Sequence, residues 1–206
     1  MRTDTIETFL AQLAARVPAP GGGATAGLHA AQAAALVAMV ARYSDSAKYA
    51  AHAEEIAAIT ATANRLRQNA LALAEEDAAA FTAVTEAYGL PKGTPDEAAA
   101  RSQTIAKALV AAAHVPAIVI AVAEQVLSLA EQLLPIGNRN VISDVAAAAE
   151  AARAAATTAR VNVEINLGGI MDATTREELA AVVETVDDLV LRAEKVTAAV
   201  RDGLVR

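Results

Sequence analysis

A stretch of 42 residues, from Ala47 to Tyr88, contains neither glycine nor proline, the residues that most often interrupt a helix. An unbroken helix of that length would span roughly 60 Å at ~1.5 Å per residue, longer than an ordinary domain is wide. The stretch therefore contains a break, or it forms a helix that reaches into a partner. Alanine, 57 of the 206 residues, is the strongest helix former and lets neighbouring helices approach closely. We predict an all-α fold, a single multihelical domain of long packed helices over residues 1–206.

Capping and breaking residues divide the remaining chain into helices. The segment "PAPGGG" interrupts the chain before a helix that we expect over Ala24–Arg42. Thr94, followed directly by proline and three positions later by glutamate, predicts the start of another helix, which Pro116 should kink or split. A further helix is expected over Ser143–Leu167; it includes "VNVEINL", which also has the β-branched residues of a short strand. No repeat, low-complexity linker or charge run marks a domain boundary.

Charge and composition argue against several classes of protein. A net charge of −7 and only five phenylalanine and tyrosine residues are unlike the basic, aromatic-rich surfaces that bind nucleic acid. The absence of cysteine excludes disulfides and thiolate metal sites. The three histidines, His29, His52 and His114, are far apart and do not have the spacing of metal ligands, so we expect no metal site.

The hydrophobic fraction of 55% raises the question of a membrane protein, but much of it is alanine, which is only weakly apolar. The longest stretch without a formal charge, Val17–Ala41, contains two prolines and a glycine triplet at its start, which makes a poor spanning segment. The opening "MRTDTIETFL" carries acidic residues and lacks the apolar run of a signal peptide. We therefore expect a soluble, cytoplasmic protein that does not bind a membrane.

Three short motifs could carry chemistry. The first is the glycine triplet Gly21, Gly22 and Gly23, for which two interpretations are open. It forms a plain turn, or it places bare backbone N–H groups at a helix N-terminus, where an anion or a ligand carbonyl would bind. The acidic cluster ending at Asp77 is a solvated face or, if Asp77 faces a partly dry pocket, a carboxyl group with a raised pKa that serves as a general acid or base. The third motif, "GNRNVISD", is explained by a helix cap, although its asparagines and arginine also suit recognition of the amide edge of a heterocycle.

Five segments occur in the order found in one enzyme family: "TIETFLAQLA", "PAPGGGATAG", "EEDAAAFTAVTEAYGLPKGTPDE", "GNRNVISD" and "ARVNVEINLGGI". In this respect the chain resembles the cyclodeaminase/cyclohydrolase family, which comprises the C-terminal half of formiminotransferase-cyclodeaminase and the stand-alone methenyltetrahydrofolate cyclohydrolases. The resemblance covers nearly the whole chain. It implies an all-helical fold, a homodimer with long helices at its interface, and a one-carbon derivative of tetrahydrofolate as substrate, with no cofactor.

The resemblance also implies site residues. The family's catalytic aspartate corresponds to Asp77, and its glycine segment lines the folate site. Two departures involve positive charge: Lys48 stands alone where relatives carry a run of lysines, and Gly168 stands where they tend to have a lysine. The implied substrate-binding residues are Pro20, Gly21, Gly22, Gly23, Lys48, Lys92, Asn138, Asn140, Ser143 and Asp144.

The function implied is hydrolysis of 5,10-methenyltetrahydrofolate to 10-formyltetrahydrofolate by a methenyltetrahydrofolate cyclohydrolase. A close alternative is formimidoyltetrahydrofolate cyclodeaminase, which releases ammonia from the same carbon. A third possibility is a helical dimer that binds folate without turnover, because lysines of the family pattern are missing. The sequence does not separate these alternatives.

Overall fold

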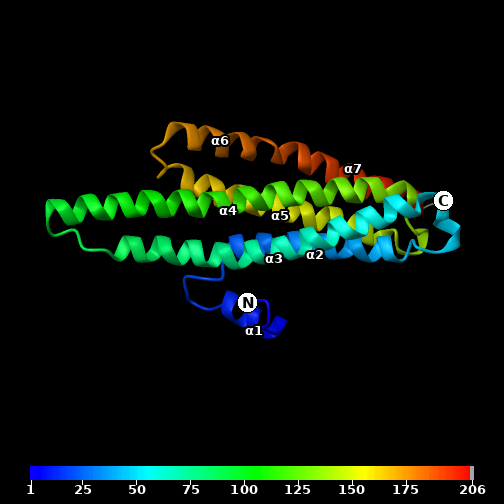
Figure 1. The fold of residues 1–206 in the computed structure, drawn as a ribbon, viewed down its shortest axis with the longest axis horizontal. Helices are drawn as coiled ribbons and strands as arrows, with labels where there is room; N and C mark the ends of the chain where they lie inside the picture. Colours follow the sequence, from blue (N-terminus) through cyan, green and yellow to red (C-terminus); the bar gives the residue numbers. More distant parts are fainter. Residues whose placement is uncertain (205–206) are drawn as a thin grey trace.

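The computed structural model describes residues 1–204, and every regular element in that range is helical (Figure 1). The all-α prediction is therefore confirmed. The α-helices are α1 (Ile6–Leu13), α2 (Gly22–Arg42), α3 (Ala53–Gly89), α4 (Pro95–Ile136), α5 (Ser143–Leu167), α6 (Ala173–Glu184) and α7 (Val186–Leu204), and two 3₁₀ helices, η1 (Ala47–His52) and η2 (Arg139–Val141), connect them at one end of the molecule.

Helix α2 is the centre of a bundle in which it packs against α3, α5 and α4. Its buried residues are all alanine, glycine or valine, so the neighbouring backbones approach closely. At Gly27 a Cβ atom would lie 2.9 Å from the backbone nitrogen of Ala74 and 3.0 Å from the carbonyl oxygen of Ala70. The small residues of α2 thus set the distance between α2 and α3.

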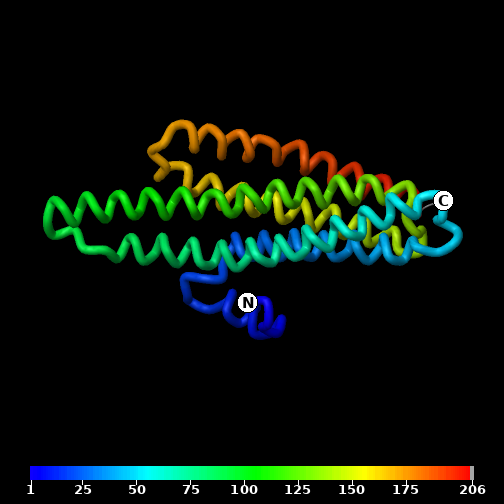
Figure 2. Tube along the Cα trace, in the orientation of Figure 1, coloured from blue at the N-terminus to red at the C-terminus, as the bar shows by residue number. Residues whose placement is uncertain are grey.

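Helices α3 and α4 are unbroken and, at 37 and 42 residues, extend together past one end of the bundle (Figures 1 and 2). Thr94 begins α4 as expected: its hydroxyl accepts from the backbone N–H of Glu97, and the Glu97 carboxylate accepts from the backbone N–H of Thr94. Pro116 was expected to kink or split this helix; the split is wrong, and a kink stays a prediction. Pro116 is buried within α4, and the packing of the long helix offsets the local cost of one missing hydrogen bond.

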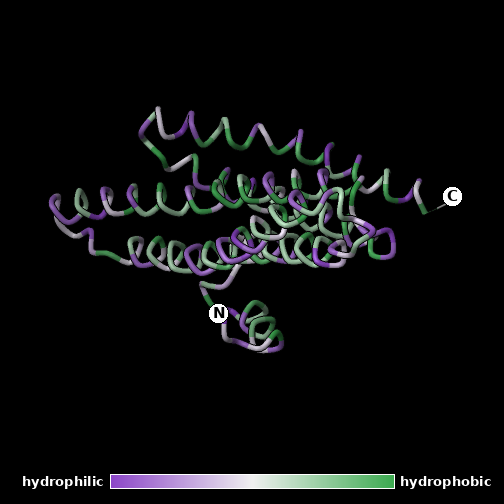
Figure 3. Tube along the Cα trace, turned by 45° about the vertical axis from the view of Figure 1, so that its right-hand side comes forward, coloured by the Kyte–Doolittle hydropathy of each residue, from purple (hydrophilic) through white to green (hydrophobic). Residues whose placement is uncertain are grey.

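Helix α1 stands apart from the bundle at its side, and none of its described residues is buried (Figure 1). The N-terminal segment is tied to α3 by Arg2, whose Nε and backbone N–H donate to the Glu75 carboxylate at 2.8 and 3.1 Å. On the opposite side, α6 and α7 pack on α4 and α5, and hydropathy alternates along them as expected for helices with one face on a bundle (Figure 3).

Two helices, α2 and α4, are long and apolar enough to cross a membrane by length and composition alone. Helix α2 is the buried centre of the bundle, and the core helix of a soluble protein passes the same test.

Candidate active site

A cavity of about 360 Å³ lies where the N-terminus of α2 meets α3, α4 and α5. It brings together segments that are far apart in the sequence, including the glycine segment and Asp77. Its size suits the ring system of a small-molecule ligand. The cavity is lined by Pro18, Ala19, Gly21, Gly22, Gly23, Asp77, Phe81, Leu109, Ala112, Asn162, Ile165 and Asn166.

Asp77 projects from α3 over the first turn of α2. A Cβ atom at Gly23 would fall on the Asp77 carboxylate, so only glycine leaves room for the side chain in this position. Burial raises the pKa of Asp77 above its ordinary value, and a hydrogen bond from the backbone N–H of Ala24 partly opposes the rise. A partly dry carboxylate with a raised pKa is suited to exchanging protons with a bound molecule.

The acidic cluster in which Asp77 lies has members with different environments. Glu75 accepts hydrogen bonds from Arg2, and the bond from the Arg2 backbone is the main cause that lowers its pKa. Glu76 is exposed, whereas Asp77 faces the cavity. One side chain of the three is therefore placed for chemistry.

The glycine segment forms the floor of the cavity at the start of α2. The N-cap residue, Gly21, has no side chain to cap this helix N-terminus, and among its first N–H groups that of Ala24 donates to the Asp77 carboxylate. Gly22 lies under the amide group of Asn162, whose Nδ2 and Oδ1 atoms would be 3.4 and 3.8 Å from a Cβ atom at Gly22. Gly23 thus makes room for the Asp77 side chain, whereas Asn162 lies over Gly22 at a distance that a Cβ atom would tolerate.

The structure does not bring the other predicted site residues to this cavity. Helix α2 has 21 residues, about 30 Å at ~1.5 Å per residue, and most of these side chains lie at its far end. Asn138 is used there by the fold: its backbone N–H donates to Ser44 Oγ, its Nδ2 donates to the Tyr43 carbonyl, and its Oδ1 accepts from the Asn140 N–H. The residues at that end are Lys48 in η1, Asn138 and Asn140 around η2, and Ser143 and Asp144 at the start of α5.

Lys92 lies in the opposite direction, in the exposed loop that joins α3 to α4. Twelve residues separate Asp77 from the end of α3, which places the loop about 18 Å beyond Asp77 along the helix axis. Pro20 immediately precedes the glycine segment. Substrate binding by Lys92, Pro20 and the residues at the far end of α2 stays a prediction.

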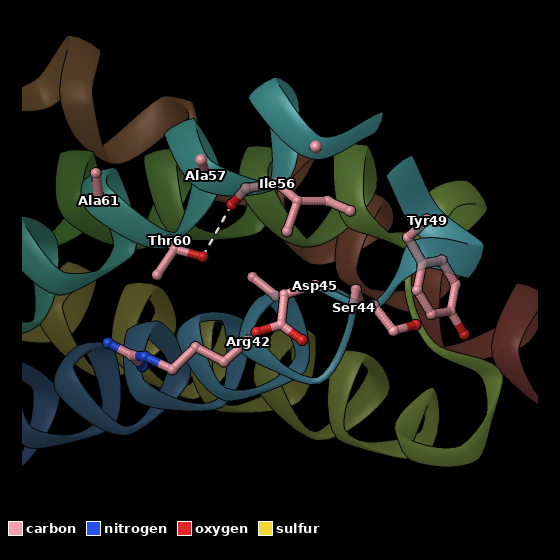
Figure 4. A pocket seen from close by; sticks show the side chains of 11 residues that line it. Arg42, Ser44, Asp45, Tyr49, Ile56, Ala57, Thr60 and Ala61 are labelled. Carbon is pink, nitrogen blue, oxygen red and sulfur yellow. Dashed lines mark hydrogen bonds between the residues drawn. The ribbon is translucent and has the colours of Figure 1, made fainter. Parts of the chain in front are cut away.

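A second cavity, of about 390 Å³, lies at the far end of α2, between α2, η1 and α3 (Figure 4). In Figure 4 the Asp45 carboxylate and the Tyr49 ring face the space between the end of α2 and α3. Arg42 is held by the carbonyl of Ala38 and by Asn64 Oδ1, at 3.3 and 3.0 Å. Since its described lining includes neither Asp77 nor the glycine segment, this cavity is a weaker candidate for the active site.

Sequence reasoning missed six residues that line the Asp77 cavity: Phe81, Leu109, Ala112, Asn162, Ile165 and Asn166. A signal for the two asparagines was present, because they are four residues apart in a segment predicted to be helical and therefore share a face. No comparable signal marks Phe81 or Leu109, since apolar side chains at helical spacing are usually core.

Comparison with known proteins identifies the fold and its family. The formiminotransferase-cyclodeaminase family profile matches residues 5–185. The chain belongs to the formiminotransferase-cyclodeaminase family. Membership confirms the resemblance expected from the five ordered segments.

Two curated members and one solved structure place the chain within this formiminotransferase-cyclodeaminase family. The chain is 40% identical over 176 residues to the methenyltetrahydrofolate cyclohydrolase of Methylorubrum extorquens, and the match covers 85% of each protein. It is 30% identical over 175 residues to the formimidoyltransferase-cyclodeaminase of Mus musculus, covering 84% of this chain but only 32% of the mouse protein. The crystal structure of formiminotetrahydrofolate cyclodeaminase from Thermotoga maritima has a TM-score of 0.86 at 30% identity and covers 100% of this chain and 99% of that one.

Proposed function

We propose that this protein is a methenyltetrahydrofolate cyclohydrolase, which hydrolyses 5,10-methenyltetrahydrofolate to 10-formyltetrahydrofolate. The observation that carries the proposal is the position of Asp77, a partly buried carboxyl group held over the glycine start of α2 in a cavity that suits a ring system. The relative at 40% identity, which matches along 85% of its length, is an enzyme of that name.

The chemistry requires one group that accepts and then returns a proton. The substrate carbon is bonded to two folate nitrogens and carries positive charge, so water attacks it once a base removes a proton from that water. Asp77 accepts this proton, and the attack gives a tetrahedral carbon bearing a hydroxyl group. The C–N5 bond then breaks as Asp77 returns a proton to N5, the hydroxyl proton is released, and the carbon remains on N10 as a formyl group. The reaction requires only water and this carboxyl group, so we propose that no cofactor takes part.

Formimidoyltetrahydrofolate cyclodeaminase is the second candidate. The observation that favours it is the TM-score of 0.86 with a formiminotetrahydrofolate cyclodeaminase over the whole chain. In that reaction a folate nitrogen attacks the formimino carbon and ammonia leaves, again through a tetrahedral carbon between the two nitrogens. The same cavity and the same carboxyl group serve either reaction.

The test supplies each substrate separately to the purified protein. A cyclohydrolase accelerates loss of the near-ultraviolet band of 5,10-methenyltetrahydrofolate above the buffer rate. A cyclodeaminase releases ammonia from formimidoyltetrahydrofolate, which a coupled ammonia assay measures. Acceleration of ammonia release without any acceleration of the first reaction would replace the first candidate by the second, and no acceleration of either would leave a folate-binding protein without turnover.

We further propose a homodimer in the cytoplasm. Support for the dimer comes from apolar side chains left exposed on the arm formed by α3 and α4 and on α1: Phe81 is 49% exposed, Tyr88 52%, Ile6 80% and Leu10 53%. A second copy would cover such side chains. The cytoplasmic setting agrees with a chain that has no cysteine.

A further inference from the structure

Asn162 and Asn166 of α5 both line the Asp77 cavity and are anchored in the same way. The Nδ2 of Asn162 donates to the carbonyl of Thr158, and the Nδ2 of Asn166 donates to the carbonyl of Asn162, each at 2.8 Å. These bonds to the preceding turn fix which end of each amide is nitrogen and which is oxygen. The two side chains are four residues apart, so they stand one above the other on the helix face that borders the cavity.

Anchoring leaves hydrogen-bonding capacity unused in both amides. Each Oδ1 has no donor among residues 1–204, and each Nδ2 has a second hydrogen without an acceptor in the same range. Both side chains are half-buried, which makes an unused amide oxygen more costly than one in bulk water. A ligand in the cavity would therefore gain by presenting N–H groups to these oxygens.

We infer that Asn162 and Asn166 form the hydrogen-bonding edge of the pocket that binds and orients the ring system of the substrate. The inference rests on the proposed function, which supplies the ligand class: a reduced pterin ring carries N–H donors at its amino group, at N3 and at N8, and a carbonyl acceptor beside them. Asn162 lies over Gly22, and Asp77 lies over the adjacent Gly23, so a ring bound by the two asparagines has its one-carbon group near the carboxylate.

These two asparagines are not the pair that the sequence suggested. Asn138 and Asn140 were expected to recognise a heterocycle, but the polar atoms of Asn138 are used to join α2 to η2. Asn162 and Asn166 offer the same chemistry with their oxygens free, in the cavity that contains Asp77.

Equilibrium binding tests the inference separately from turnover. The probe is 5-formyltetrahydrofolate, titrated by calorimetry into the unmodified protein and into Asn162→Ala and Asn166→Ala. Each variant should bind about tenfold more weakly, since one hydrogen bond to a half-buried amide is lost. In turnover the same variants should raise KM more than they lower kcat, as expected for a contact made with the bound substrate.

The matched control is Asn64→Ala. Asn64 has the same anchor, because its Nδ2 donates to the carbonyl of Thr60 at 2.8 Å, but it lies on α3 away from this cavity. Alanine favours a helix at all three positions, so the variants should fold. Unchanged affinity in Asn162→Ala and Asn166→Ala, an equal loss in Asn64→Ala, or no binding by the unmodified protein would each overturn the inference, whereas binding without turnover would refute the proposed reaction alone.

Discussion

Replacing Gly23 by alanine should remove most of the activity while leaving the stability of the fold almost unchanged. The new Cβ atom would lie 2.5 Å from Oδ2 of Asp77, and real Cβ atoms essentially never approach another atom closer than 3.0 Å. Ordinary contact begins at 3.4 Å, and Oδ1 and Cγ of Asp77 would lie closer still, so the carboxylate must retreat by more than about 1 Å, a displacement of a reacting group that can cost on the order of 10²-fold in rate. We expect kcat for 5,10-methenyltetrahydrofolate to fall by about that factor.

Two opposing effects keep the free energy of unfolding of Gly23→Ala close to its present value. Alanine is favoured over glycine in a helix by up to about 1 kcal/mol. A displaced Asp77 side chain that leaves its preferred rotamer costs about 0.5–1.5 kcal/mol. The urea concentration at the unfolding midpoint should therefore shift little, although kcat falls.

Gly89→Ala is the control for this experiment, because no atom of the described chain lies within 4 Å of a Cβ atom at Gly89 and this residue does not line the Asp77 cavity. It should keep most of its activity. Stopped-flow or steady-state absorbance gives kcat, and urea denaturation gives stability. A Gly23→Ala protein with full kcat would refute the reasoning, because catalysis would then not depend on the position that the Asp77 carboxylate occupies over Gly23.

Three further predictions concern the packing and the charges. Asp77→Asn should lose about 10²–10⁴-fold in rate, the range for a general acid–base group, and should be at least as stable as the unmodified protein at neutral pH. Because burial raises the folded-state pKa of Asp77, ionised Asp77 opposes folding above that pKa. The extra stability of Asp77→Asn should therefore disappear as the pH falls through this pKa, which thermal melts over a pH series would show. A variant less stable than the unmodified protein at neutral pH would contradict the expected direction of the effect. Gly27→Ala should lose about 1–3 kcal/mol in urea denaturation, because its Cβ would meet the backbone of α3, which cannot rotate away; an unchanged midpoint would show that α2 and α3 are free to separate. Light scattering at micromolar concentration should give twice the chain mass of 21.0 kDa, and a monomer would contradict the proposed homodimer.

Helix positions could largely be predicted from the sequence, since alanine content, caps and breakers act locally. Thr94 begins α4 and Leu167 ends α5 as expected. Pro116 shows where local rules fail: a single proline costs one hydrogen bond, but it lies in the part of α4, from Ala112 onward, that is packed in the bundle, and the helix does not break there.

The candidate site was predicted in part. The ordered segments indicated Asp77 and the glycines, and the structure brings these together. They did not indicate that the 21-residue helix α2 separates the glycines from Asn138, because motif order carries no distance. Asn162 and Asn166 were missed because the β-branched residues around them bear on whether the segment is a helix or a strand. The signal for a site is a different one, the helix face that the two amides share.

The most direct test of the account is the rate at which the purified protein removes the near-ultraviolet band of 5,10-methenyltetrahydrofolate, measured beside Asp77→Asn. The account predicts clear acceleration over the buffer rate by the unmodified protein and loss of nearly all of that acceleration in the variant, with the fold of both confirmed by circular dichroism. Equal acceleration by the two proteins would contradict the assignment of Asp77, and no acceleration by either would contradict the proposed cyclohydrolase reaction.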